Sequence, residues 1–285
     1  MDDNNVATAA SGTIELGGDL TVRRMGFGAM RLTGPGIWGE PRDRDEAKAV
    51  LRRAIELGVN FIDTADSYGP DVSEELIAEA LHPYPEDLVI ATKGGLERTG
   101  PNRWPSNARP EHLKEACDGS LRRLRLDEIP LYQLHRPDPR VPYEDSVGAL
   151  VELKEAGKIR HIGVSNVTEG HLRTAQSLTP VVSVQNRYNV ADRGSEAMLD
   201  LCEQEDLAFL PYSPIQDYVG NTRVGEVATH HRVTPTQVVL AWLLARSPAM
   251  LPIPGTGSVP HLEENVTAST IRLEPGEVAA LLHAA

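Results

Sequence analysis

Polar side chains stand at the ends of several short apolar runs in this sequence. Asp63, Lys93 and His135 each end such a run, and Tyr68 follows Asp63 by five residues. A free phenol, with a pKa near 10, donates its proton reluctantly at neutral pH, but a nearby ammonium group favours the phenolate. These residue types predict general acid catalysis on an oxyanion. Tyr68 would be the acid, Asp63 would keep Lys93 charged, and His135 would orient the substrate oxygen.

The later apolar runs also end in polar residues. Ser165 and Asn166 follow one run, Gln185 ends the next, and Tyr212 and Ser213 follow a third. A single histidine or lysine in such a place usually forms an ion pair at the surface. Because all of these runs end in groups of this kind, we interpret them as one site.

The elements that must position these residues alternate regularly along the chain. The runs interpreted as buried parallel strands are Met25 to Gly28, Asn60 to Asp63, Leu88 to Lys93, Ile129 to His135, His161 to Ser165, Val181 to Asn186, Ala208 to Tyr212 and Met250 to Pro254. Segments with a 3.6-residue apolar period lie between them. The order favours a (β/α)8 TIM barrel, in which the carboxyl ends of all strands meet at one mouth.

The ends of the chain complete the predicted barrel. Residues 1–12 are expected to form a disordered or loosely held tail, and residues 13–285 one domain. The pair Gly17-Gly18 between two short apolar segments predicts a β-hairpin, which would cap the bottom of the barrel. Extra helices are expected near the C-terminus. Three helix starts carry cap signals, namely Asp43 with Glu46, Asp71 with Glu74 and Thr234 with Gln237.

Composition excludes several classes of function. The 28 Lys and Arg against 41 Asp and Glu give a formal charge of −13, which disfavours nucleic acid and anionic membranes as partners. No stretch is long and apolar enough to cross a bilayer, and the N-terminus lacks a secretory signal, so a cytoplasmic location is expected. The two cysteines are expected to be buried thiols. His230-His231 has no ligand spacing around it, so no metal site is predicted.

Sequence motifs over nearly the whole chain resemble the aldo-keto reductase family. They are GVNFIDTADSYG from Gly58, followed in order by IATKGG, YQLHRPD, IGVSN, SVQNRYN, PYSP and the closing IPGT...HLEEN. The resemblance implies a barrel enzyme that reduces carbonyl groups with NADPH, with NADH possible. It places the catalytic tetrad on Asp63, Tyr68, Lys93 and His135. It implies cofactor contacts at Gly28, Met30, Asp63, Ser165, Asn166, Gln185, Tyr212, Ser213, Pro214, Ile253, Gly255, Thr256, Ser258, His261, Glu264 and Asn265.

The cofactor phosphates need a binding turn, and the sequence offers two glycine-rich candidates. Gly26 to Met30 lacks the third glycine of a dinucleotide fingerprint and is interpreted as a tight strand end. Pro254 to Ser258 leaves the last strand and enters a helix, whose free N–H groups favour an anion. The lysine and arginine that often grip the 2′-phosphate in the family are replaced here by Gly255 and His261. NADPH is therefore expected from the family and not from these residues.

Substrate selection is expected to depend on the long loop from Gly94 to Asn107. Trp104 in this loop could cover a flat substrate, and Arg98 or Arg103 could meet an anionic group, although packing within the loop explains these residues as well. Trp38 is a second candidate for substrate contact.

Several functional alternatives remain open at this level. The stretches GAMRLTGPGIWGEPRDRDEA and VQNRYNVADR are similar to bacterial pyridoxal reductases, which makes pyridoxal the best guess for the substrate. Reductases of sugars or of secondary metabolites share much of this pattern. A non-catalytic cofactor-binding subunit, or an aldolase that uses Lys93 as a Schiff base, are alternatives from other classes. A monomer or a small homo-oligomer is expected.

Overall fold

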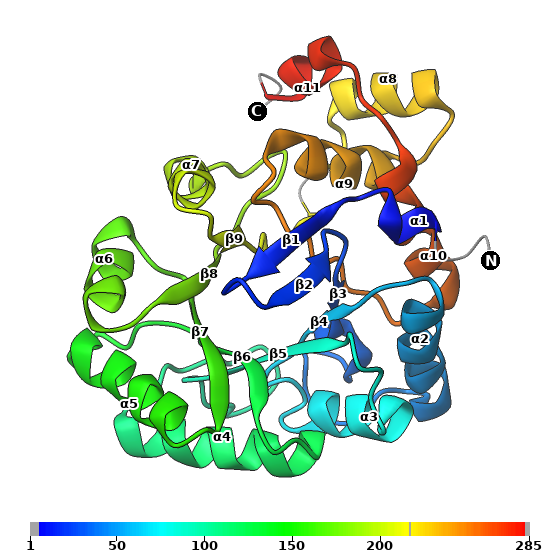
Figure 1. Cartoon of the computed structure of the whole chain (residues 1–285). Coiled ribbons are helices and arrows are strands. Elements are labelled where there is room, and N and C mark those ends of the chain that lie inside the picture. The colour runs from blue at the N-terminus through cyan, green and yellow to red at the C-terminus, as the bar shows by residue number, and fades with distance from the viewer. Residues whose placement is uncertain (1–5, 217, 283–285) are drawn as a thin grey trace.

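Seven parallel strands curve around a common axis in the computed structural model, which describes residues 6–216 and 218–282 (Figure 1). Each strand pairs with the next one in the chain, from β3 to β9. The strands are β3 Phe27–Gly28, β4 Phe61–Asp63, β5 Val89–Gly94, β6 Ile129–Leu134, β7 Ile159–Ser165, β8 Val181–Gln185 and β9 Ala208–Phe209. All seven overlap predicted strands, and together with the surrounding helices they form the predicted TIM-barrel-like α/β fold.

The eighth predicted strand, Met250 to Pro254, differs from the expectation. It forms no regular strand, yet it closes the barrel by hydrogen bonds to both neighbours. Leu251 N donates to Phe209 O at 2.9 Å, and Gly26 N donates to Pro252 O at 2.9 Å. The physical reason is that Pro252 and Pro254 have no N–H to contribute to a ladder.

The helices lie outside the barrel strands (Figure 1). They are α2 Arg44–Glu56, α3 Val72–Leu81, α4 Pro110–Leu124, α5 Tyr143–Glu155, α6 Glu169–Leu178, α7 Glu196–Gln204, α8 Thr222–His231, α9 Pro235–Arg246, α10 Val259–Thr267 and α11 Pro275–Leu282, with 3-10 turns η2 Ala29–Leu32 and η3 Ala268–Thr270. In α2 the residues Ala47, Val50, Leu51 and Ala54 are buried at helical spacing, which explains how this helix covers the sheet. Within the described residues, no helix could span a membrane.

The hairpin of β1 (Thr13–Leu16) and β2 (Leu20–Arg23) crosses one end of the barrel, as predicted (Figure 1). Leu16 and Val22 belong to the same buried cluster as Phe61, Val89 and Leu131, which lie toward the beginnings of their strands. The hairpin therefore covers the amino ends of the strands. The polar residues at the carboxyl ends face the opposite mouth.

Part of the segment that was expected to form a tail, residues 1–12, has a defined structure. Residues 1–5 lie outside the described part of the chain. Residues Val6–Ala9 form the short helix α1, and the buried hydroxyl of Thr8 donates to Leu57 O at 3.0 Å. Residues 6–12 are thus held against the barrel, because the Thr8 hydroxyl satisfies a carbonyl at the end of α2.

Two of the three predicted helix caps are confirmed. Asp43 accepts from Glu46 N at 2.9 Å, and Thr234 forms a capping box with Gln237. The third prediction is confirmed only as a helix start: Asp71 is the N-cap residue of α3, but its φ is +70° and its side chain makes no cap bond. Instead, the Asp71 carboxylate pairs with Arg123 at 3.1 Å, because α4 brings that guanidinium to the start of α3.

Candidate active site

The four predicted catalytic residues meet at the mouth of the barrel. Asp63 is the last residue of β4, Lys93 lies in β5, and His135 directly follows β6. Tyr68 lies in the loop between β4 and α3. All four side chains are buried, with Tyr68 only 6% and His135 8% exposed. Neighbouring parallel strands explain the convergence, because their carboxyl ends share one rim.

Lys93 is the centre of a buried hydrogen-bond group. Its Nζ donates to Asp63 Oδ2 at 2.6 Å, to Thr64 O at 2.8 Å and to the Tyr68 hydroxyl at 3.4 Å. These three acceptors use the three protons of an ammonium group. The arrangement therefore holds a charged lysine against the phenol, as the residue types predicted.

Two glutamines complete the shell around Asp63. Its Oδ1 accepts from Gln185 Nε2 at 2.8 Å and from Gln133 Nε2 at 3.1 Å. The carboxylate thus receives donors on both oxygens, which stabilises its charge in a dry environment. Gln185 keeps its Oε1 for the neighbouring pocket, because its amide nitrogen is held by Asp63.

The protonation states follow from burial and charge. Burial favours neutral Lys93, but the charges of Asp63 and Tyr68 outweigh it and raise the pKa of Lys93. Burial also raises the pKa of Tyr68 above 10, although Lys93 acts in the opposite direction. The expectation that Lys93 brings the phenol below its usual pKa is therefore corrected: the lysine opposes a rise that burial causes. Tyr68 carries its proton throughout the neutral range.

His135 is a neutral imidazole. Burial, followed by the positive charges of Lys93 and Arg136, holds its pKa well below 6.5. Its Nδ1 lies 3.5 Å from the Ser67 hydroxyl, and its ring meets the Tyr68 ring edge-on at a centroid distance of 5.9 Å. A neutral ring at this place can exchange a hydrogen bond with an oxygen without adding charge to the site.

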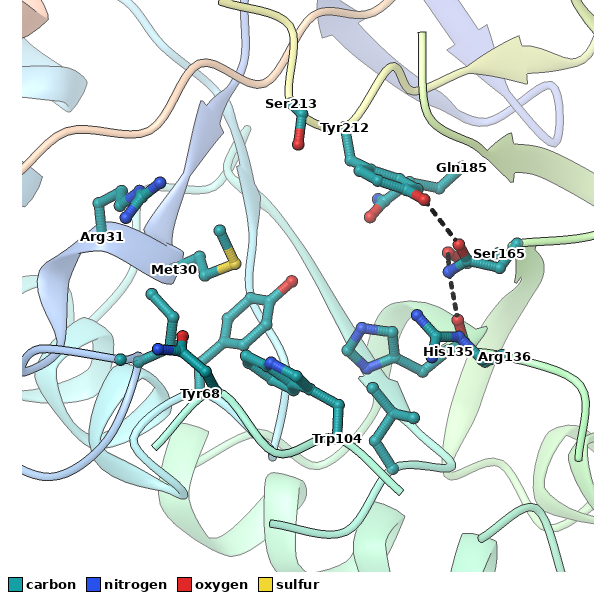
Figure 2. Close-up of a pocket in the computed structure, with 15 residues that line it drawn as sticks. Met30, Arg31, Tyr68, Trp104, His135, Arg136, Ser165, Gln185, Tyr212 and Ser213 are labelled. Carbon is teal, nitrogen blue, oxygen red and sulfur yellow. Dashed lines mark hydrogen bonds between the residues drawn. The ribbon is translucent and has the colours of Figure 1, made fainter. Parts of the chain in front are cut away.

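A cavity of about 460 Å³ opens beside Tyr68 and His135 (Figure 2). Its lining brings together side chains from many of the loops at the mouth. They are Met30, Arg31, Gly36, Ile37, Tyr68, Leu96, Asn102, Trp104, His135, Arg136, Ser165, Asn166, Gln185, Tyr212 and Ser213. Asp63 and Lys93 lie beneath this surface. The lining contains six of the predicted cofactor residues, Met30, Ser165, Asn166, Gln185, Tyr212 and Ser213.

Hydrogen bonds fix the wall of the cavity around Asn166 (Figure 2). Its Nδ2 donates to His135 O at 3.0 Å and to Ser165 Oγ at 3.1 Å, and its Oδ1 accepts from the Tyr212 hydroxyl at 2.9 Å. Asn166 and Ser213 both have left-handed backbone, with φ of +58° and +55°. Left-handed backbone in residues other than glycine is costly, and such residues gather at functional sites.

The other predicted cofactor residues lie away from this cavity. Gly28 and Gly255 stand back to back, since a Cβ on Gly28 would lie 2.6 Å from Ile253 O and one on Gly255 would lie 2.5 Å from Gly28 O. This close approach agrees with the interpretation of Gly26 to Met30 as a tight strand end. Thr256 accepts from Ser258 N at 3.1 Å, and Ser258 is the N-cap residue of α10 with its own hydroxyl unused for capping.

The remaining predicted contacts are spread over α10 and the loop after β9. His261 is exposed, and Asn265 is buried. Glu264 accepts from the Thr234 hydroxyl at 2.5 Å, a contact that links α10 to the start of α9. Pro214 is buried next to Ser213. His261, Glu264 and Asn265 lie in α10, the helix that follows the turn predicted for the phosphates.

The two tryptophans differ in position. Trp104 lines the cavity and meets the Tyr68 ring edge-on at 6.3 Å, whereas Trp38 is not part of the lining. The Arg98 guanidinium stacks on Trp104 at 3.6 Å and on Trp38 at 5.6 Å. Arg98 also donates to Ile37 O at 2.6 Å and to Ser67 O at 2.8 Å. The suggestion that Arg98 meets an anionic ligand is thus corrected: it ties three loops together.

Sequence reasoning missed several residues of the lining. Arg31 and Arg136 were not predicted, although each directly follows a predicted site residue, Met30 or His135. That adjacency is the signal that could have found them. Leu96 and Asn102 also line the cavity, and they lie in the loop from Gly94 to Asn107 that was expected to select the substrate. Gly36 and Ile37 line it as well, and their turn-forming or apolar character gave no such signal.

His230 and His231 form a cluster that the sequence did not predict. Glu277 of α11 lies 2.8 Å from His230 Nδ1 and 2.9 Å from His231 Nε2. The three side chains could hold a metal ion, and they lie on the outer helices α8 and α11. Their contacts with one another already explain them as a link between these helices.

Comparison with known proteins identifies close relatives over the whole length. The sequence model of the aldo/keto reductase family matches residues 24–284. An uncharacterized oxidoreductase of Schizosaccharomyces pombe is 49% identical over 97% of this chain and 90% of its own length. The pyridoxine 4-dehydrogenase of Escherichia coli is 42% identical over 95% of this chain and 98% of its own.

Solved structures agree with these sequence matches. The thermostable aldo-keto reductase Tm1743, in complex with the inhibitor epalrestat, superposes with a TM-score of 0.84 at 33% identity, over 96% of this chain and 99% of its own. An aldo/keto reductase of Klebsiella pneumoniae in complex with NADP and acetate has a TM-score of 0.80 at 30% identity, over 94% and 93% of the two chains.

Proposed function

The chain belongs to the aldo/keto reductase family as an NAD(P)H-dependent oxidoreductase, and from this premise we propose that it reduces an aldehyde to an alcohol with Tyr68 as the proton donor. The observation that carries the proposal is the buried contact between Lys93 Nζ and the Tyr68 hydroxyl at 3.4 Å, beside a cavity that His135 also lines. Pyridoxal is the proposed substrate, since a relative of 42% identity is a pyridoxine 4-dehydrogenase.

Each of the four residues Asp63, Tyr68, Lys93 and His135 would have its own role in this reduction. The nicotinamide cofactor supplies the hydride when bound. The carbonyl oxygen then gains negative charge, and Tyr68, which holds its proton at neutral pH, delivers that proton. Lys93 stabilises the phenolate that remains, and Asp63 keeps the ammonium in place. Neutral His135 would orient the oxygen by a hydrogen bond.

The residues present fit a nicotinamide dinucleotide. The half-buried ring of Tyr212 is held by its hydroxyl bond to Asn166, which suits stacking on a flat ring. Ser165, Asn166 and Gln185 offer polar atoms for a carboxamide. The turn from Pro254 to Ser258 leads into α10, where the helix N-terminus favours phosphate groups.

An assay of NADPH oxidation with a panel of carbonyl compounds tests the proposed function. The panel contains pyridoxal, methylglyoxal, benzaldehyde and keto sugars. Pyridoxal should give the highest kcat/KM, and a sugar in that place would support the alternative reductases. If every compound leaves NADPH unchanged while the protein binds NADPH, a non-catalytic cofactor-binding subunit becomes the better interpretation. A Schiff-base enzyme is disfavoured because Asp63 keeps Lys93 as an ammonium ion and not as a nucleophilic amine.

The first prediction concerns cofactor choice. Gly255 and His261 stand where other family members often carry a lysine and an arginine, so the 2′-phosphate lacks this charged clamp. We expect the preference for NADPH over NADH, measured as the ratio of kcat/KM values, to stay below about 1000-fold, some 4 kcal/mol, and to fall with added salt. A larger preference that persists at high salt would contradict this expectation.

A variant of Arg31 shows, in the same comparison of NADPH with NADH, which phosphate group this arginine contacts. Its Cγ lies 3.6 Å from the place that a Cβ on Gly255 would occupy, so this exposed arginine stands beside the predicted phosphate turn. Arg31→Gln should raise the KM of NADPH and of NADH alike by roughly tenfold, since a contact to the shared pyrophosphate serves both. A selective loss for NADPH would instead assign Arg31 to the 2′-phosphate.

The second prediction concerns Trp104. Because its ring forms a wall of the cavity next to Tyr68, Trp104→Ala should raise the KM of an aromatic aldehyde about tenfold, or roughly 1.4 kcal/mol, and spare methylglyoxal. Trp38→Ala is the matched control, since Trp38 also stacks on Arg98 but does not line the cavity. Equal effects of both variants would mean that Trp104 only supports the loop.

A further inference from the structure

The cavity carries positive charge in a strongly acidic protein. The chain has a formal charge of −13, yet the described residues that line the cavity include Arg31 and Arg136 and no Asp or Glu. The two arginines lie on opposite sides of the cavity in the view of Figure 2. Arg31 stands beside the predicted phosphate turn, but Arg136 lies with His135 on the other side, so the phosphate turn does not account for it.

Arg136 has no acidic partner among the described residues. Its side chain is exposed, and the structure gives it no ion pair or side-chain hydrogen bond there. The acids nearby are already engaged. Asp138 is bound by Arg140 at 2.8 Å, and Asp192, close to Tyr212, is bound by Arg187 at 2.6 Å. Within residues 6–216 and 218–282, the guanidinium of Arg136 is thus left for a group that these residues do not supply.

The position of Arg136 relates it to the substrate. It directly follows His135, and its charge contributes to lowering the pKa of His135 and opposes the rise that burial causes in the pKa of Tyr212. It therefore lies close to both the proposed carbonyl-orienting residue and the proposed nicotinamide-stacking residue. Trp104, Leu96 and Ile37 give the same cavity an apolar lining, which suits an aromatic ring.

We propose that Arg136 binds an anionic oxygen carried on the ring of the substrate, so that the enzyme selects aromatic aldehydes with a carboxylate or phenolate group. This rests on the proposed carbonyl reduction and names its substrate class. A planar guanidinium can hold both oxygens of a carboxylate, which fixes the orientation of the ring as well as its affinity. The aldehyde at the other part of the ring would then reach His135 and Tyr68.

The test compares two aldehydes that differ in charge, 4-carboxybenzaldehyde and benzaldehyde, with NADPH. The wild-type protein should prefer the carboxylate. In Arg136→Gln the ratio of their kcat/KM values should fall by about 10- to 100-fold, mainly through the KM of the charged compound, because a charge-assisted hydrogen bond has been removed. Arg136→Lys should retain part of the preference. Arg122→Gln, which removes an exposed arginine from α4, should leave the ratio at the wild-type value.

A ratio in Arg136→Gln within about twofold of the wild-type ratio would overturn the proposal, whatever the absolute rates. Binding of 4-(hydroxymethyl)benzoate in the presence of NADP, measured by calorimetry, gives a readout that does not need turnover. The Gln variant should bind it about tenfold more weakly than the wild type, and equal binding would also overturn the proposal. If the wild type reduces neither aldehyde but binds this alcohol through Arg136, the proposed reaction fails and the anion site stands.

Discussion

Tyr68→Phe is expected to lower the turnover of aldehyde reduction by a factor on the order of 100 or more, while the affinity for NADPH changes by only a few fold. The substitution removes one hydroxyl group, whose contact with Lys93 Nζ is 3.4 Å long. A positioned acid contributes about 100- to 10,000-fold to a rate, or about 3 to 5 kcal/mol. The phenyl ring keeps its edge contacts with Trp104 and His135, so the fold should be unchanged.

Steady-state rates with pyridoxal and cofactor binding measured by fluorescence check this prediction together. Tyr84→Phe is a matched control, because it removes a half-buried hydroxyl that donates to Leu124 O at 2.6 Å, away from the mouth of the barrel. That variant should lose about 1 kcal/mol of stability and little turnover. Near-normal turnover in Tyr68→Phe would assign the proton transfer to another group.

The pKa values also predict the pH dependence of the wild-type reduction. His135 has its pKa well below 6.5 and Tyr68 has its pKa above 10, so both keep one protonation state between pH 7 and 9. The chemical step should therefore be flat across this interval.

The sequence predicts well where the four candidate catalytic residues lie, because their positions depend on local rules. A polar residue that ends a buried strand lies at the carboxyl rim of a parallel barrel, and this placement does not depend on how the helices pack. Asp63, Lys93 and His135 satisfy this rule directly, and the five-residue step to Tyr68 stays within one loop. The eighth strand shows the limit of the rule, since the apolar pattern predicted it and Pro252 and Pro254 removed its ladder.

Other features depend on contacts between distant segments, which one sequence does not reveal. Arg98 is held by carbonyls of Ile37 and Ser67, from loops 61 and 31 residues away. Asp71 has a helix-cap signal but pairs with Arg123 of the next helix. The raised pKa of Tyr68 arises from burial, which depends on how Trp104 and the neighbouring loops close over it. The cofactor contacts on α10 stay predictions for the same reason.

Lys93→Met is expected to damage both catalysis and stability. Lys93 is fully buried and its Nζ lies 2.6 Å from Asp63 Oδ2, so its loss leaves a buried carboxylate without its cation. Breaking one partner of such a pair costs about 3 to 5 kcal/mol of unfolding free energy. The amides of Gln133 and Gln185 still donate to Asp63. The loss of unfolding free energy is therefore expected near the lower end of this range, at about 3 kcal/mol. Thermal or denaturant unfolding measures it.

A double-mutant cycle with Asp63→Asn separates the charge from the packing. If the ion pair causes the loss, the double variant Asp63→Asn/Lys93→Met should be more stable than Lys93→Met alone, because the unpaired buried charge has gone. Equal or lower stability of the double variant would assign the loss to the packing of the lysine stem.

Lys93→Met should shift the pH profile of catalysis in a direction that a structural defect would not produce. Lys93 acts to lower the pKa of Tyr68, against the larger effect of burial, so its removal raises that pKa further. A weaker acid slows reduction at every pH, by a factor on the order of 100. The reverse reaction, oxidation of the alcohol by NADP, needs the phenolate as base, so its rate should begin to rise only at a more alkaline pH than in the wild type. A uniform loss in both directions, with an unmoved pH profile, would show that Lys93 only supports the shape of the site.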